Sequence, residues 1–251
     1  MPHASPLFHV KICGVTTPED AALVARAGAD AIGLNFVPGS PRCLAVAAAR
    51  EVAAAIPAGV LRVGVFAGMP PADILRVVDE VGLDAIQLHG HLGDHPFKDH
   101  PLEDDAGPVD PPATCAALRG LPVIRAVRLG DDRQGDRLAA AREWLAAARA
   151  LGAPAVLALV DASVATATGA GQLGGTGARV DWTAFAAARP LEEPVALAGG
   201  LGPETVAEAI RATGVRAVDT ASGVESAPGH KDAGRVLAFV AAARSALGLT
   251  G

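Results

Sequence analysis

Short apolar runs alternate with alanine-rich, helix-type stretches along the chain. Most of the apolar runs are nearly continuous in Val, Ile, Ala and Leu, which is typical of parallel strands covered by helices on both faces. We expect eight strands, at residues 9–13, 31–36, 62–67, 85–89, 123–128, 155–161, 194–198 and 217–221. The helices expected between and after them lie at 18–27, 45–56, 70–81, 112–118, 131–151, 180–188, 203–213 and 233–247.

Eight strands that are each followed by a helix predict an α/β fold, a single (β/α)8 TIM barrel spanning residues 1–251. A doubly wound sheet would usually have fewer strands. Pro18, Pro70 and Pro203 stand where a helix start tolerates a missing N–H, and Asp181 is a possible cap. Two segments exceed a short barrel loop: a long excursion at 91–112 and a glycine-rich loop at 164–177, which we expect to be a mobile cover.

Composition narrows the function classes. The chain has 251 residues, a formal net charge of −6 and 3% aromatic residues without any Tyr, which argues against nucleic-acid binding and against a tyrosine acid. No export signal or membrane-spanning run is visible. Three cysteines at unrelated spacings predict neither disulfides nor a CxxC metal pair, so we expect a cytoplasmic protein. The oligomeric state stays open.

The carboxyl ends of parallel barrel strands meet at one mouth, and residues with reactive side chains are expected there. Cys13 ends the first predicted strand and Asp161 ends the sixth. A buried cysteine is often only a small hydrophobe, and an aspartate at a strand end is often a loop cap. Across one mouth, however, the two would form a base and an acid for proton transfer. Cys43 and Cys115 are interpreted as packing residues.

Glycine turns after the last two strands indicate a phosphate site. Gly199 and Gly200 follow strand seven, and Ser222 and Gly223 follow strand eight. Turns rich in backbone N–H groups that open short helices favour a phosphate dianion, although glycines can also simply make tight turns. Two such turns on the final strands of a barrel favour the phosphate interpretation.

Arg42 follows strand two on a rigid turn, where a guanidinium group could capture a planar carboxylate or could be a solvated surface group. Lys11 is expected to point away from Cys13, on the opposite strand face. His89, His91, His95 and His100 have no closed ligand spacing, so no metal is predicted.

The residues resemble the phosphoribosylanthranilate isomerase family of tryptophan biosynthesis over nearly the whole chain. The resemblance rests on ordered phrases at 11–14, 33–36 with 40–42, 63–66, 87–90, 159–161, 174–177 with 181–182, 197–201, and 222–225 with 228–232. The family implies a (β/α)8 enzyme that needs no cofactor. It converts N-(5-phosphoribosyl)anthranilate to 1-(2-carboxyphenylamino)-1-deoxyribulose 5-phosphate by an Amadori rearrangement.

The resemblance implies a role for each matched residue. Asp161 would be the general acid on the ribose ring oxygen, and Cys13 would take the proton from C2. Arg42 would meet the anthranilate carboxylate, and Gly199, Gly200, Ser222 and Gly223 would hold the phosphate. Residues 219–222 read Asp-Thr-Ala-Ser where the family usually reads Asp-Val-Ser-Ser, so one hydroxyl near the phosphate is missing.

Three alternatives stay open at this point. The histidine-pathway isomerase acts on a similar aminoaldose phosphate but has an aspartate where Cys13 stands, and a dual-substrate enzyme would accept both compounds. Indole-glycerol-phosphate synthase would need a catalytic lysine on an early strand, for which Lys11 is poorly placed. A barrel that binds phosphate without catalysis is the non-enzyme alternative.

Overall fold

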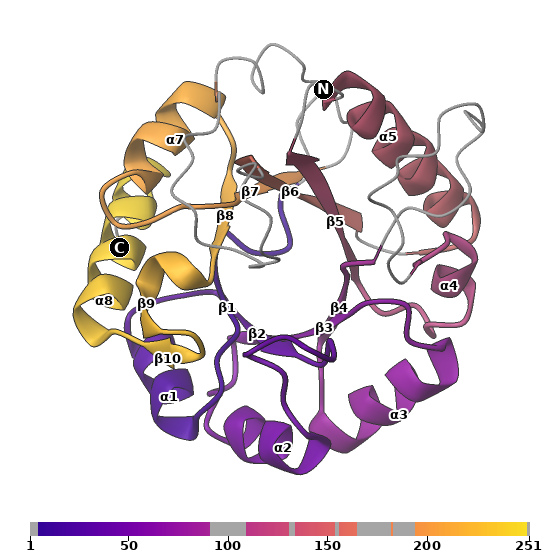
Figure 1. Ribbon diagram of the computed structural model, residues 1–251, viewed down its shortest axis with the longest axis horizontal. Coiled ribbons are helices and arrows are strands. Elements are labelled where there is room, and N and C mark those ends of the chain that lie inside the picture. Colours follow the sequence, from indigo (N-terminus) through magenta and orange to yellow (C-terminus); the bar gives the residue numbers. More distant parts are fainter. Residues whose placement is uncertain are drawn as a thin grey trace.

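Eight parallel strands close into a barrel, and the helices stand around it (Figure 1). The computed structural model describes residues 5–90, 109–130, 134–153, 156–164, 182 and 194–249. The strands are β1 Val10–Cys13, β2 Ala31–Asn35, β3 Leu61–Phe66, β4 Ala85–Leu88, β5 Val123–Gly130, β6 Val156–Val164, β7 Val195–Ala198 and β8 Ala217–Thr220. They pair in this order, and β8 returns to pair with β1. The predicted TIM barrel is confirmed.

The described helices lie close to their predicted ranges. They are α1 Pro18–Arg26, α2 Val46–Ala54, α3 Pro71–Val81, α4 Ala113–Ala116, α5 Gln134–Ala150, α7 Val206–Thr213 and α8 Ala233–Ala246. The Thr17 hydroxyl caps α1 and the Asp232 carboxylate caps α8, each by accepting a backbone N–H bond. Pro203 does not start α7, because residues 203–205 form a turn first. The predicted helix at 180–188 and the Asp181 cap lie outside the described residues, apart from Trp182.

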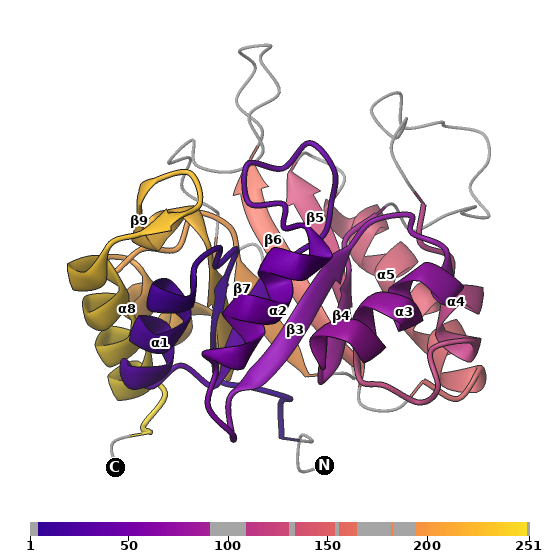
Figure 2. The ribbon, with the colours of Figure 1, turned by 90° about the horizontal axis from the view of Figure 1, so that it is seen from below.

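Two short elements after β8 were not predicted. A turn of 3-10 helix, η1 (Ser222–Val224), leads into β9 (Glu225–Ala227), which pairs antiparallel with β10 (His230–Lys231). In the side view, β9 lies at the end of the barrel to which the arrowheads of β5 and β6 point (Figure 2). The hairpin therefore belongs to the end where the strands finish.

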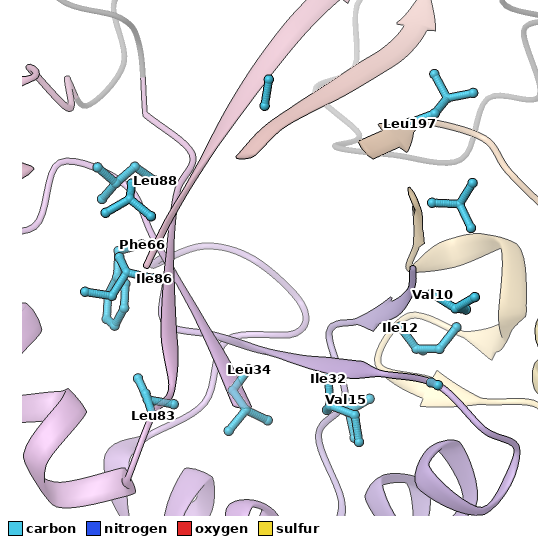
Figure 3. Close-up of a cluster of buried hydrophobic side chains, with 14 of the residues drawn as sticks. Val10, Ile12, Val15, Ile32, Leu34, Phe66, Leu83, Ile86, Leu88 and Leu197 are labelled. Carbon is cyan, nitrogen blue, oxygen red and sulfur yellow. The ribbon is translucent and has the colours of Figure 1, made fainter. Parts of the chain in front are cut away.

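The apolar core has two layers, set by the alternation of side chains along each strand. Val10 and Ile12 of β1 face the helices and join a large cluster that includes the residues labelled in Figure 3. The opposite strand faces fill the barrel interior with a smaller cluster of mostly small residues: Phe8, Ala31, Val63, Ala85, Ile124, Ala126, Leu157, Leu159, Ala196, Ala198 and Ala217. Side chains thus pack the interior and leave chemistry to the strand ends.

A single domain with an excursion at 91–112 and a loop at 164–177 stays a prediction, because residues 91–108 and 165–181 are not described. Among the described residues, none of the helices combines the length and the apolar character that crossing a membrane requires.

A buried ionic cluster fixes the chain where it returns to the barrel at Asp110. The Asp110 carboxylate accepts the N–H groups of Gly68 (2.8 Å) and Gly90 (2.6 Å) and lies 3.6 Å from Arg125 Nη1. Trp144 donates its indole N–H to the Asp110 carbonyl, and the Arg125 guanidinium lies 5.0 Å from the centre of the Trp144 ring. Asp110 thus joins the turns after β3 and β4 to β5 through its carboxylate, and to α5 through its backbone carbonyl.

We expect Asp110→Asn to lower the free energy of unfolding by about 3–5 kcal/mol, because it leaves the buried Arg125 charge without its counter-ion. Urea unfolding followed by circular dichroism measures the change. The matched control is Asp79→Asn, since Asp79 pairs with Arg119 at 3.2 Å while its side chain is 60% exposed. The control should cost less than about 1 kcal/mol. Equal losses in the two variants would contradict a special role of the cluster.

Candidate active site

Cys13 is the last residue of β1 and lies in register with Gly33 of β2. Its side chain is on the inward face of the barrel, and the residue is only 9% exposed. A Cβ atom on Gly33 would come within 2.6 Å of the Cys13 Sγ. The missing side chain at position 33 therefore makes the room that the thiol occupies against the neighbouring strand.

Lys11 lies beneath Cys13 on the same inward face. The prediction that they point to opposite faces is wrong, because residues two apart on a strand share a face. Lys11 Nζ donates to Asp219 Oδ1 of β8 at 2.8 Å, with the two side chains 0% and 9% exposed. Burial alone would lower the pKa of Lys11, but its interactions with Asp219 and Cys13 outweigh this and raise it. A buried cation thus stays charged next to the thiol.

Asp161 lies on β6, in register with Arg128 of β5 and Ala198 of β7. The prediction that the strand ends at Asp161 is wrong, since β6 continues to Val164. Alternation from Leu157 and Leu159, which face the barrel interior, puts Asp161 on the inward face near the mouth. Asp161 is partly buried there.

His89 directly follows β4, and nearby charged groups influence its pKa. Burial lowers its pKa to about 4, with Arg128 and Lys11 adding to the decrease and Asp161 opposing it. Gln87 Nε2 lies 3.3 Å from His89 Nδ1. Lys11 interacts electrostatically with both His89 and Cys13, and His89 interacts with Asp161. Sequence analysis considered His89 only as a possible metal ligand and gave Gln87 no role of its own.

Arg42 lies in the turn after β2, and its side chain is 11% exposed. It is therefore not a solvated surface group. Its aliphatic stem crosses Gly14, the residue after Cys13, where φ is +69° and a Cβ atom would collide with Arg42 Cδ. Arg42 Nε and Nη2 donate to the two carboxylate oxygens of Glu225 at 2.8 and 2.6 Å.

Glu225 and Lys231 take part in this arrangement, although sequence analysis gave neither a role. Lys231 Nζ donates to Glu225 Oε1 at 2.8 Å and to the Cys13 carbonyl at 2.7 Å. Both residues stand in phrases that carry the family resemblance, which was the available signal. Their contacts with Arg42 and Cys13 depend on the hairpin β9–β10, and residue spacing alone did not reveal them.

The two glycine turns are in contact. Gly199 and Gly200 have φ values of +92° and +63°, and there is open space where a side chain of Gly200 would lie. A Cβ atom on Gly223 would collide with the Leu201 carbonyl, and Thr220 Oγ1 donates to that same carbonyl at 2.6 Å. The turns after β7 and β8 are therefore joined into one surface, and Ser222 begins η1 beside it.

The other cysteines differ from each other. Cys115 is buried in the core, and burial raises the pKa of its thiol to about 11, as expected of a packing residue. Cys43 is exposed, so the packing prediction is wrong for it. Among the described residues, no group of three His, Cys, Asp or Glu side chains could hold a metal ion. His91, His95 and His100 lie outside that part of the chain.

Comparison with known proteins decides the family. The sequence profile of N-(5'phosphoribosyl)anthranilate (PRA) isomerase matches residues 10–101 and 112–242. The chain belongs to this isomerase family. It is 40% identical over 236 residues to N-(5'-phosphoribosyl)anthranilate isomerase of Neisseria meningitidis serogroup B, covering 94% of this chain and 96% of that relative. The chain is thus an isomerase that carries out an Amadori rearrangement.

Solved structures of the family agree with the fold. Phosphoribosyl anthranilate isomerase from Thermotoga maritima is 32% identical with a TM-score of 0.71, over 95% of this chain and 100% of that chain. A second crystal structure of the family contains reduced 1-(o-carboxyphenylamino)-1-deoxyribulose 5-phosphate. It is 31% identical with a TM-score of 0.67, over 95% of this chain and 100% of that chain.

The lowered pKa of His89 makes the stability of this isomerase depend on pH. The unfolded state takes up this proton near pH 6.5 and the folded state only near pH 4, so between these values the unfolded state binds more protons. The contribution is fully present above about pH 6.5 and is lost as the pH falls towards 4. A change from pH 7 to pH 5 should lower the free energy of unfolding by about 2 kcal/mol through His89.

Urea unfolding of the wild type and His89→Gln at both pH values measures this effect. The variant should lack about 2 kcal/mol of the wild-type pH dependence. The control is His9→Gln, since His9 lies at the opposite end of β1, where its ring contacts the Arg216 carbonyl. The control should keep the His89 contribution. An unchanged pH dependence in His89→Gln would show that this ring is protonated equally in both states.

Proposed function

We propose that Asp161 and Cys13 are the general acid and general base with which the chain isomerises N-(5'-phosphoribosyl)anthranilate, without a cofactor. Asp161 donates a proton to the ribose ring oxygen as the C1–O bond breaks and the amine nitrogen forms a protonated imine. The Cys13 thiolate then removes the proton from C2, which the imine has acidified. The resulting enolamine tautomerises to the ketone.

The observation that supports the proposal is that Cys13, Asp161 and the two glycine turns all lie near or just after the carboxyl ends of strands in one closed parallel barrel. The two reactive groups come from β1 and β6, so they can act on different sides of a sugar held between them. Lys11 places a buried positive charge on the same inward face of β1 as Cys13. With a pKa of about 4, His89 is neutral near pH 7 and adds no positive charge to the mouth.

The substrate has a carboxylate at one end and a phosphate at the other, and groups suited to bind each of them follow the barrel strands. Arg42 would bind the anthranilate carboxylate, and Gly199, Gly200, Ser222 and Gly223 would surround the phosphate. The open space at Gly200 and the contact between Gly223 and Leu201 support a shared anion cradle. The reduced product analogue in the related crystal structure carries both a carboxylate and a phosphate. Anchoring both ends would orient the ribose for proton transfer.

This assignment implies a small phosphorylated molecule as the partner and the cytoplasm as the place of action. The acidic net charge of −6 gives no support to a nucleic-acid partner.

Cys13→Ser and Asp161→Asn should each lower kcat by about 10²–10⁴-fold, the usual contribution of one acid or base. Loss of substrate fluorescence as the anthranilate compound is consumed measures turnover. Binding of the reduced product analogue, measured by calorimetry, should change little in either variant. Cys43→Ser is the matched control, because Cys43 is an exposed cysteine and should tolerate the same replacement.

A barrel that only binds phosphate would give no turnover in the wild type, and unchanged turnover in both variants would exclude Cys13 and Asp161 from proton transfer. The histidine-pathway aminoaldose phosphate serves as the second substrate in the same assay series. Turnover of both compounds would identify a dual-substrate enzyme. The presence of a thiol instead of a carboxylate at position 13 favours the anthranilate compound alone.

A further inference from the structure

The β9–β10 hairpin holds Arg42 by two buried residues. Glu225 of β9 is 6% exposed and Lys231 of β10 is 8% exposed. Glu225 Oε1 accepts from both Arg42 Nε and Lys231 Nζ, each at 2.8 Å, while Oε2 accepts from Arg42 Nη2 at 2.6 Å. Burial alone would raise the pKa of Glu225, but Arg42 and Lys231 outweigh it and keep the pKa below its ordinary value.

The geometry leaves part of the Arg42 guanidinium available. A guanidinium group has five N–H donors, and Glu225 occupies the side formed by Nε and Nη2. A second carboxylate can bind at the end formed by Nη1 and the other N–H of Nη2. Within the part of the chain that the structure describes, Nη1 has no recorded hydrogen-bond partner. Arg42 can therefore keep Glu225 while it binds a ligand.

Lys231 determines the charge of this assembly. Its ammonium has three acceptors, the carbonyls of Cys13 (2.7 Å) and Ala221 (3.2 Å) and the carboxylate of Glu225, which matches its three N–H groups. With Lys231 charged, Glu225 is shared between two cations and one positive charge remains. Without Lys231, Glu225 would neutralise Arg42 and an incoming carboxylate would meet no net charge.

We propose that Glu225 and Lys231 are positioning residues for the substrate carboxylate. Glu225 fixes the plane of the Arg42 guanidinium, and Lys231 preserves the positive charge that Arg42 offers to the ligand. Lys231 also ties this unit to the backbone of Cys13, so the carboxylate site and the base keep one geometry. The inference rests on the proposed function, in which Arg42 binds the anthranilate carboxylate.

Two ligands separate this role from a general structural one. The first is the reduced product analogue, which carries the carboxylate, and the second is the same compound with an unsubstituted phenyl ring. Calorimetry gives the Kd of each for the wild type, Glu225→Gln and Lys231→Met. Both variants should weaken binding of the first ligand by about 10-fold or more, the effect of one charge-assisted hydrogen bond. Binding of the second ligand should change less than about 2-fold.

Arg42→Met provides the second arm of the experiment. In that background, Glu225→Gln and Lys231→Met should cause no further loss for the carboxylate ligand, because both act through the guanidinium. Ser226→Ala is the matched hairpin control: Ser226 is an exposed residue on β9 next to Glu225, and its hydroxyl donates to the His230 carbonyl at 3.4 Å. It should bind both ligands like the wild type.

Equal weakening for the two ligands, or additive losses with Arg42→Met, would overturn the positioning role. Glu225→Gln keeps the shape of the side chain, so it decides the question even where Lys231→Met does not fold. Failure of the proposed function has a different signature. It would be seen as an absence of turnover in the wild type. If only this inference fails, the wild type is active, and the hairpin variants prefer the carboxylate ligand over the phenyl ligand as strongly as the wild type does.

Discussion

The closure of β1 against β8 is the constraint on which the mouth depends. Val10, Lys11 and Ile12 pair with Val218, Asp219 and Thr220, and this register brings the first and last strands of the barrel side by side. The buried pair Lys11–Asp219 spans the same seam from inside the barrel. A one-residue slip of β1 would turn Lys11 out of the barrel interior and leave the buried Asp219 without its partner, because side chains alternate along a strand. The register of β1 against β8 therefore brings Lys11 and Asp219 together, and their ion pair in turn favours that register.

The same seam is fastened from outside by the β9–β10 hairpin. Thr16 donates to the Gly229 carbonyl at 2.5 Å, and the backbone N–H of Lys231 donates to Asp20 Oδ2 at 3.2 Å. These bonds join the hairpin after β8 to the turn after β1 and to the first turn of α1, more than 200 residues away in the sequence. The hairpin thus ties together the chain segments that follow the two strands of the seam.

The sequence was sufficient for the repeating part of the molecule. Continuous apolar runs identified the strands, and Cys13 at the end of β1 followed from the same pattern. It was insufficient where contacts between residues far apart in the sequence determine the role of a side chain. Glu225 and Lys231 are only six residues apart, but their roles come from Arg42, which is 183 residues away from Glu225. The end of β6 was also misplaced, because pairing with β5 extends the strand past Asp161.

The charges around Cys13 show how a buried site can remain available to an anion. Lys11, Arg42 and Lys231 each interact electrostatically with this cysteine, and Asp219 and Glu225 are the paired carboxylates. Buried cations are costly unless they are paired, but complete neutralisation would leave nothing to attract a ligand. Asp219 pairs with Lys11, and Glu225 pairs with both Arg42 and Lys231, so these five groups together carry one net positive charge. Under the proposed function, ion pairs that stabilise the fold also determine which N–H groups of Arg42 remain for the substrate carboxylate.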